Sequence, residues 1–329
     1  MSSKFIQELF QKFETLKVIV VGDVLVDNYI SGRVDRLSPE APVPVVNESS
    51  FESRLGGAGN VALNLKALGA KTILCSAIGA GKEGDNLIQL LNNQDLSPIA
   101  MLRSKERSTT TKTRIIGNGH QLARIDHEVT DDMNTLDSFL LQQHFEREIE
   151  GADVVIMQDY NKGVLHSENI QILIDIATKA GVPIVVDPKK DNFFAYKNVD
   201  LFKPNLKEIE EGLNIDSDLS TVEGVAEAIV LMQEKLHSKC NMVTMSERGV
   251  LISSETEKHH IKAHVRNISD VSGAGDTVIS IAACCLAAGC NLKQLAELSN
   301  LGGGLVCEEK GVVPINKDRL MSEAQIIGL

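Results

Sequence analysis

No segment of the sequence is apolar for long enough to cross a membrane. The longest nearly apolar stretch, residues 278–288, is interrupted by Ser280, whereas a membrane-spanning helix needs about 20 apolar residues. Residues 1–16 follow an amphipathic helix pattern that includes acidic side chains, and they lack the apolar centre of a secretory leader. We therefore expect a cytoplasmic protein with no membrane partner.

Basic residues are in the minority, and no block of like charges forms a basic tail. The 33 Lys and Arg residues face 45 Asp and Glu residues, which gives a formal net charge of −12. This balance disfavours nucleic acid as a partner. A local group of cations together with a metal ion could still bind an anionic substrate.

Several motifs of common enzyme classes and metal sites are also missing. The six cysteines show no CxxC spacing, and we expect most of them to be buried as small apolar side chains. The sequence has no P-loop, no H-R-D or D-F-G set, no G-x-S-x-G elbow and no H-E-x-x-H. P-loop enzymes, protein kinases, elbow hydrolases and zinc proteases are thereby excluded.

What the 329 residues do contain is an alternation of short apolar runs and helical patterns. Buried parallel strands are predicted at residues 18–23, 72–78, 153–158 and 183–188, and helices at about 58–68, 84–93, 134–149 and 167–180. This order is typical of an α/β fold with a doubly wound, mostly parallel sheet and helices on both faces. No linker-like break occurs, so we expect a single domain over residues 1–329.

Two segments interrupt this alternation, at about residues 28–55 and 98–127. Both show the period-2 pattern of exposed antiparallel strands. We interpret them together as a small β-sheet lid that closes over a site and excludes water. A hairpin extension without such a role fits the pattern equally well.

The sharpest local signal is the sequence DVSGAGD at residues 270–276, which leads into a helix of small residues. The amides of Gly273, Ala274 and Gly275 could point into one concavity at the helix N-terminus and bind an anion. Asp276 beside that anion suits a general base that takes a proton from a substrate hydroxyl during phosphoryl transfer. A tight turn followed by an ordinary helix-start aspartate remains the alternative.

A second glycine turn, at residues 56–59, runs into an amphipathic helix. Gly57, Gly59 and Ala62 satisfy the weak dinucleotide pattern G-x-G-x-x-A, which leaves a nicotinamide-dependent oxidoreductase as a candidate. The preceding segment is half-polar, however, and no acidic residue ends a second buried strand about 20 residues later. Close backbone approach and the Asn60 amide favour a ligand rich in hydroxyl groups.

Oxygen-bearing side chains also lie at the ends of the first predicted strand and of a short predicted strand at residues 199–202. Asn205 and Glu208 have the spacing of a helix capping box, and the same two side chains could hold Mg²⁺, directly or through water. Asp23 and Asp27 come after the first strand, at the end where open α/β sheets bind ligands. Both aspartates could equally be loop caps.

GGAGNVALNLKALG and DVSGAGD, about 200 residues apart in this order, resemble the two signatures of the ribokinase-like carbohydrate kinases, or PfkB family. Within that family the chain resembles the kinases of D-glycero-D-manno-heptose 7-phosphate over nearly its whole length. The resemblance implies transfer of the ATP γ-phosphoryl group to the anomeric hydroxyl of this sugar phosphate, for the ADP-heptose precursors of lipopolysaccharide. It also implies that the chain is a stand-alone kinase, because it ends before any nucleotidyltransferase part.

The same resemblance assigns roles to individual residues. It makes Asp276 the base, with Gly273, Ala274 and Gly275 as the anion hole. ATP and Mg²⁺ would be held by Asn205 and Glu208, with Ser246, Gly249 and Asn300 bordering the nucleotide. Sugar contacts match Asp27, Gly56, Gly57 and Asn60, and partners of the 7-phosphate are expected among Arg36, Lys112, Lys162 and Lys189. Ser272 and the glycine-rich segment after Asn300 depart from the usual family pattern.

Other readings stay open at this stage. The same fold could phosphorylate a different sugar, a sugar phosphate or a nucleoside, or could bind sugar without catalysis. Exposed strand edges in the lid favour pairing with a second copy, so a homodimer through the lid is expected.

Overall fold

A computed structural model describes residues 3–213 and 217–329 of the chain, and its centre is a nine-stranded sheet. The strand order is β13-β12-β11-β10-β9-β8-β1-β4-β5. All pairs from β11 to β5 are parallel, and β12 and β13 are added antiparallel. The strands are β1 (Lys17–Gly22), β4 (Lys71–Gly79), β5 (Met101–Ser104), β8 (Val154–Gln158), β9 (Ile184–Asp187), β10 (Leu201–Phe202), β11 (Cys240–Thr244), β12 (Val250–Ser254) and β13 (Lys258–Ile261).

Helices cover both faces of this sheet because the buried strands are apolar on both sides. Val18 and Val20 of β1 pack into one core, and Ile19 and Val21 pack into the other. The first core contains α1 (Ser3–Phe13), α2 (Ala58–Leu68), α3 (Lys82–Asn93), α8 (Ala274–Ala287), α9 (Leu292–Val306) and α10 (Lys317–Ile326). The second contains α4 (Thr135–Glu148), α5 (Ser167–Lys179), α6 (Leu206–Leu213) and α7 (Val222–Leu236).

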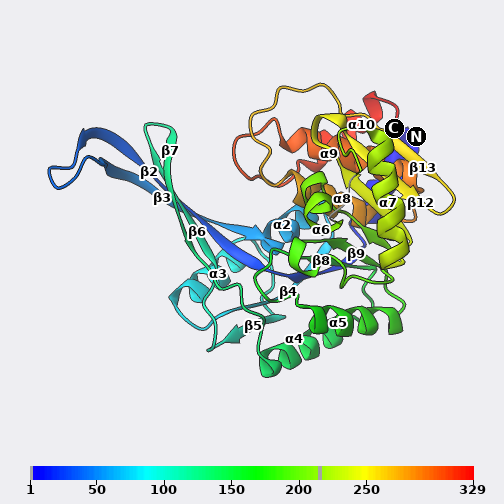
Figure 1. Cartoon of the computed structure of the whole chain (residues 1–329), viewed down its shortest axis with the longest axis horizontal. Coiled ribbons are helices and arrows are strands. Elements are labelled where there is room, and N and C mark those ends of the chain that lie inside the picture. Colours follow the sequence, from blue (N-terminus) through cyan, green and yellow to red (C-terminus); the bar gives the residue numbers. More distant parts are fainter. Residues whose placement is uncertain (1–2, 214–216) are drawn as a thin grey trace.

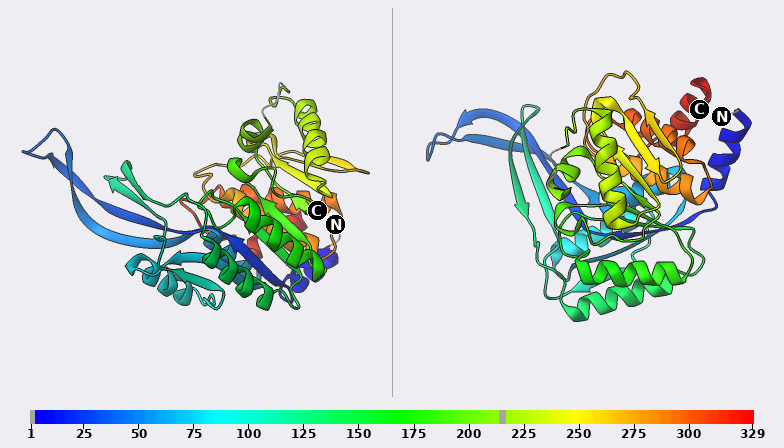
Figure 2. Two further views of the ribbon diagram at one scale, coloured as in Figure 1. Left: turned by 60° about the horizontal axis from the view of Figure 1, so that its bottom comes forward. Right: turned by 45° about the vertical axis from the view of Figure 1, so that its right-hand side comes forward.

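A second, four-stranded sheet extends away from the helices (Figures 1 and 2). Its order is β3-β2-β6-β7, formed by β2 (Val24–Leu37), β3 (Pro44–Gly57), β6 (Thr111–Gly117) and β7 (His120–His127). The β2–β3 hairpin runs from the pair Val24 and Gly57 at the body to the pair Leu37 and Pro44 at the tip. We call this sheet the lid.

Most predicted elements are confirmed, and the lid needs two corrections. The four predicted buried strands match β1, β4, β8 and β9, and the four predicted helices match α2, α3, α4 and α5. The second lid segment was predicted too long, because β5 pairs with β4 in the large sheet. The lid is also not wholly antiparallel, since β2 and β6 pair in parallel.

The expectation that most cysteines are buried is also met. Five cysteines are buried, and Cys290 is partly buried. In the described ranges, no helix is both long and apolar enough to span a bilayer.

Candidate active site

Asp276 lies in the first turn of α8, and its side chain is 6% exposed. The helix can start here because Gly273 adopts a left-handed conformation with φ 80°, and the small residues that follow let α8 sink into the core. The carboxylate receives hydrogen bonds from Asn60 Nδ2 (2.6 Å), the Tyr160 hydroxyl (2.9 Å) and Gln158 Nε2 (3.4 Å). The second glycine motif and the end of β8 therefore converge on this carboxylate.

The surroundings of Asp276 shift its proton affinity towards neutral pH. Burial raises the pKa of the Asp276 carboxyl to about 6, and the nearby charge of Asp187 adds to this rise. Hydrogen bonds from Asn60 and Tyr160 and the charge of Lys203 oppose it by lowering the pKa. A carboxylate with this pKa is mostly ionised at pH 7 and is still basic enough to take a proton.

One of the three amides predicted to form an anion hole is already paired. The backbone amide of Ala274 donates to the Val271 carbonyl at 3.3 Å, because the turn before α8 closes on itself. Among the described residues, the backbone amides of Gly273, Gly275 and Asp276 have no such partner. An anion at this helix start could therefore be bound by these three amides.

A cavity of about 970 Å³ opens beside this helix start. Its lining includes the predicted base, the three residues before it and all five residues predicted to border ATP and its metal, namely Asn205, Glu208, Ser246, Gly249 and Asn300. The Asn300 amide donates to the Lys262 carbonyl at 2.9 Å, so this side chain supports the cavity wall. Residues far apart in sequence thus line one space large enough for a nucleotide.

Asn205 and Glu208 form the predicted capping box at the start of α6. The Asn205 amide donates to Glu208 Oε2 at 2.9 Å, and the Glu208 amide donates to Asn205 Oδ1 at 2.9 Å. The other Glu208 oxygen is paired with Lys189. These contacts leave little room for a metal bound directly by both side chains, whereas the remaining lone pairs can accept hydrogen bonds from metal-bound water. The residues fit Mg²⁺ in that indirect way.

An ion pair that the sequence motifs do not include lies at the centre of the site. Lys203 Nζ lies 3.1 Å from Asp187 Oδ1, and both side chains are almost fully buried. A Cβ atom on Gly275 would lie 3.9 Å from the same Nζ, so the ammonium group is next to the helix start. The signal was present in the sequence, because Asp187 lies near the end of the strand predicted at residues 183–188 and Lys203 follows the one at residues 199–202, at the edge where ligands bind.

The predicted sugar contacts gather at the base of the lid. Asp27 accepts a hydrogen bond from Arg114 Nη1 at 2.5 Å. A Cβ atom on Gly56 would lie 2.3 Å from Asp27 Oδ2, and one on Gly57, which has φ 59°, would lie 2.4 Å from the Asp23 carbonyl. Both positions therefore require glycine. Since Gly57 ends the lid strand β3, the turn does not follow the first buried strand, as a nicotinamide-binding turn would.

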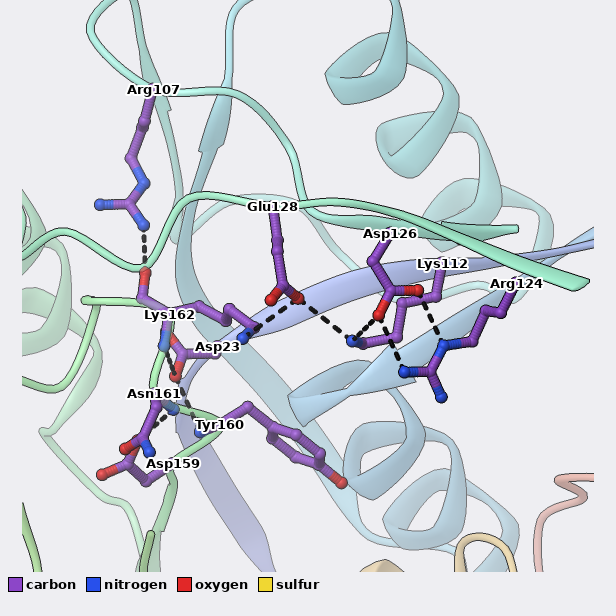
Figure 3. A network of polar contacts seen from close by, with 10 residues as sticks. All are labelled: Asp23, Arg107, Lys112, Arg124, Asp126, Glu128, Asp159, Tyr160, Asn161 and Lys162. Atoms are coloured by element: carbon purple, nitrogen blue, oxygen red, sulfur yellow. Dashed lines mark hydrogen bonds and ion pairs between the residues drawn. The ribbon is translucent and has the colours of Figure 1, made fainter. Parts of the chain in front are cut away.

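The four predicted phosphate partners lie in different parts of the structure. Lys112 and Lys162 both contact Glu128 Oε2 at 3.1 Å, so β6 and the loop after β8 bring the two ammonium groups to one carboxylate (Figure 3). Lys189 lines the cavity instead. Arg36 pairs with Val45 near the tip of the β2–β3 hairpin, so within one chain it lies apart from the other three.

The loop after β8 is organised by one buried carboxylate. Asp23 accepts hydrogen bonds from the backbone amides of Tyr160 (2.8 Å), Lys162 (3.1 Å) and Val164 (3.1 Å). Figure 3 shows Asp23 beneath this loop, with Arg107 reaching the Lys162 carbonyl from the other side. The loop-cap interpretation of Asp23 is therefore confirmed, and the cap places both Tyr160 and Lys162.

Two lid arginines were also missed. Arg54 on β3 and Arg114 on β6 come from the two strands that flank β2, and their guanidinium carbons lie 5.0 and 5.2 Å from the centroid of the Tyr29 ring. They share a face of the lid with Asp27, since Asp27 pairs with Arg54 on β3 and is two positions from Tyr29, the partner of Arg114. Each guanidinium group is also ion-paired, Arg54 with Glu52 and Arg114 with Asp27, next to the predicted sugar contacts.

The chain resembles known proteins over most of its length. Residues 15–319 match the pfkB family carbohydrate kinases. The chain is 34% identical to the bifunctional protein HldE of Trichlorobacter lovleyi over 328 residues, which cover 99% of this chain and 66% of that protein. It is 39% identical to the bifunctional protein HldE of Caulobacter vibrioides over 296 residues, 89% of this chain and 60% of that protein. The chain therefore spans less than two thirds of the length of these relatives.

Solved structures share the fold at low sequence identity. Phosphofructokinase-2 from Escherichia coli in complex with fructose-6-phosphate has a TM-score of 0.78 at 19% identity, and the match covers 94% of this chain and 98% of that chain. Ribokinase from Arabidopsis thaliana complexed with ribose and ATP has a TM-score of 0.71 at 16% identity, covering 93% and 99%. From the sequence match over residues 15–319, the chain belongs to the PfkB family and is an ATP-dependent carbohydrate kinase.

Proposed function

We propose that this kinase phosphorylates the anomeric hydroxyl of D-glycero-D-manno-heptose 7-phosphate with ATP. The observation that carries the proposal is the buried Asp276 carboxylate, which faces a nucleotide-sized cavity on one side and the sugar-contact motif, through Asn60, on the other. The relatives named HldE support the choice of a heptose phosphate within the family. The reaction would supply a sugar 1,7-bisphosphate to the ADP-heptose pathway, in the cytoplasm.

In this proposal the protein supplies a base, an anion site and cations. Asp276 takes the proton of the anomeric hydroxyl as its oxygen bonds to the γ-phosphorus and the bond to the ADP oxygen breaks. The backbone amides of Gly273, Gly275 and Asp276 and the ammonium group of Lys203 stabilise the charge on the transferring group. Mg²⁺, when bound with ATP, would neutralise part of the phosphate charge, and Asn205 and Glu208 would hold it through water.

The 7-phosphate requires a positive site away from the reacting hydroxyl. Lys112 and Lys162 meet at Glu128 in the structure, and we assign them as the phosphate partners, with Glu128 holding them in place in the free protein. Arg114 and Arg54 lie on the same side of the lid, where they are paired with Asp27 and Glu52. The ammonium groups of Lys112 and Lys162 can together bind one phosphate dianion once the phosphate has displaced the Glu128 carboxylate.

A coupled assay of ADP release over a panel of sugars tests the proposal. We expect turnover with heptose 7-phosphate and at least tenfold lower kcat/KM with fructose 6-phosphate and ribose. Asp276→Asn should lower kcat by about 100- to 10,000-fold, because general bases contribute that much, while circular dichroism stays unchanged. Preference for an unphosphorylated sugar would contradict the acceptor, and a fully active Asp276→Asn would contradict the base.

We also propose that the chain acts as one domain and forms a homodimer through the lid. The support is a partly exposed apolar lid face opposite the Asp27 face, formed by Ile30, Phe51, Ile115 and Ile125. A second lid is the occupant that this face fits best, since β3 and β7 are open sheet edges beside it.

A further inference from the structure

Tyr160 is the side chain that connects the base to the loop after β8. Its hydroxyl lies 2.9 Å from Asp276 Oδ1, while its backbone amide is held by Asp23 at 2.8 Å. The Lys189 ammonium group lies 5.4 Å from the ring centroid, so the ring is fixed on that side too. Backbone, ring and hydroxyl are therefore all held in one arrangement.

We propose that Tyr160 is a positioning residue that keeps Asp276 ionised and aimed at the substrate hydroxyl. The inference rests on the proposed role of Asp276 as the base. Tyr160 contacts the base and need not touch the substrate. The sequence signatures of the two glycine motifs do not include it.

The chemistry of a buried phenol supports this role. Burial, followed by the charge of Asp276, raises the pKa of the Tyr160 hydroxyl well above its usual value of 10. The phenol therefore stays protonated throughout the working range of pH, and towards a carboxylate it can only donate. A donor of this kind stabilises the ionised form of Asp276 and leaves the protonated form without the same support.

Other charged groups lie near Asp276 and Tyr160 and interact with them electrostatically. Asp187 at the end of β9 raises the pKa of the Asp276 carboxyl, and Lys203 after β10 lowers it. Lys189 lies near enough to interact with the charge of Asp276, and Asp27 lies near enough to act on the Tyr160 hydroxyl. Asp187 is already paired with Lys203. Removing the Tyr160 hydroxyl leaves all of these charges in place, so its effect can be measured alone.

The test is the pH dependence of kcat and kcat/KM for Tyr160→Phe. In the wild type, activity should fall as pH drops through about 6, where Asp276 takes up a proton. Loss of a hydrogen bond to a charged group should move this acidic limb upwards by about one to two pH units. At pH 7 kcat should therefore fall by about two- to tenfold, with KM for sugar and ATP unchanged.

Tyr196→Phe is a matched control. Tyr196 is also buried and donates to a carboxylate, Asp159 Oδ2, at 2.7 Å, but it does not contact Asp276. We expect its acidic limb to coincide with the wild type. An unmoved limb in Tyr160→Phe, or an equal shift in both variants, would overturn the proposal.

If the Tyr160→Phe protein does not fold, a second variant provides the test. Replacing only Tyr160 by 3-fluorotyrosine keeps the shape and makes the phenol a stronger donor, so the acidic limb should move downwards; an unmoved limb would also overturn the proposal. Asp276→Asn distinguishes a failure of the base assignment from a failure of the role proposed for Tyr160. If that variant is fully active, the base assignment fails, whereas an inactive Asp276→Asn with no shift in Tyr160→Phe contradicts only the role of Tyr160.

Discussion

At the scale of single residues, the buried pair of Lys203 and Asp187 makes a sharp prediction about stability. Lys203 is 2% exposed, so Lys203→Met would leave the Asp187 carboxylate buried without its partner. Breaking a buried pair in this way costs about 3–5 kcal/mol in the free energy of unfolding. Urea denaturation followed by circular dichroism measures this loss.

Lys239→Met provides the control for that prediction. Lys239 Nζ is 2.7 Å from Asp200, but its side chain is 75% exposed. An exposed pair contributes about 1 kcal/mol or less. Equal losses in the two variants would show that Lys203 is not essential to the neutralisation of Asp187.

The site residues that could be predicted from the sequence belong to sequence motifs, whereas those that could not be predicted do not. Asp276 and Asn60 belong to glycine motifs, where local chain geometry alone suggests a binding turn. Tyr160, Asp187 and Lys203 carry no motif of this kind, and they meet only because β8, β9 and β10 end at the same edge of the sheet. Their type and position could have been inferred from the predicted strands, but their mutual contacts depend on strand order.

At the scale of the element, the start of α8 distinguishes two glycines that look alike in sequence. Gly275→Ala should fold normally, because the added Cβ would come no closer than 3.9 Å to its neighbours. The same Cβ would stand beside the amides and Lys203 where the transferring phosphate is expected. Since small misplacements of reacting groups are costly, kcat should fall on the order of 100-fold.

Gly273→Ala should have the opposite effect, because it should lower the stability of the protein more than it lowers kcat. The left-handed backbone at this position costs about 1–2 kcal/mol for any other residue, and the Cβ would lie 3.0 Å from Asn60 Nδ2 and from Val312. Thermal unfolding and steady-state kinetics of both variants separate the two cases. A Gly275→Ala protein with wild-type kcat would remove the anion site from the start of α8.

Elements were predictable where periodicity and caps agreed. The helix predicted at residues 58–68 matches α2, because a glycine turn starts it and Gly69 in the left-handed region ends it. The lid was harder to predict, since a period-2 pattern gives strands without their partners. The parallel pairing of β2 with β6, across more than 70 residues of chain, has no local signal.

At the scale of the whole molecule, an α/β order of elements was enough to predict the doubly wound sheet. Apolar strands such as β1, buried on both faces, require helices on both sides, and this follows from composition alone. What could not be predicted is how far the lid extends from the body. The β2–β3 hairpin carries apolar residues on one face and charged residues on the other, but only the folded sheet shows which face is uncovered.

The exposed lid face leads to a prediction about assembly. Phe51 is 57% exposed on β3, in the same row of the sheet as Ile30 and Ile115. If a second lid covers this face, Phe51→Glu would bury a charge in the interface, and the protein should become monomeric in sedimentation velocity experiments. Phe139→Glu on α4, where the phenylalanine is 53% exposed, is the control and should leave the dimer intact.

Because Asp27 and Arg114 lie on the opposite face of the same strands, monomers should also show a raised KM for the sugar with little change in KM for ATP. A wild-type protein that is monomeric at micromolar concentration, or dimers that survive Phe51→Glu, would contradict a lid interface.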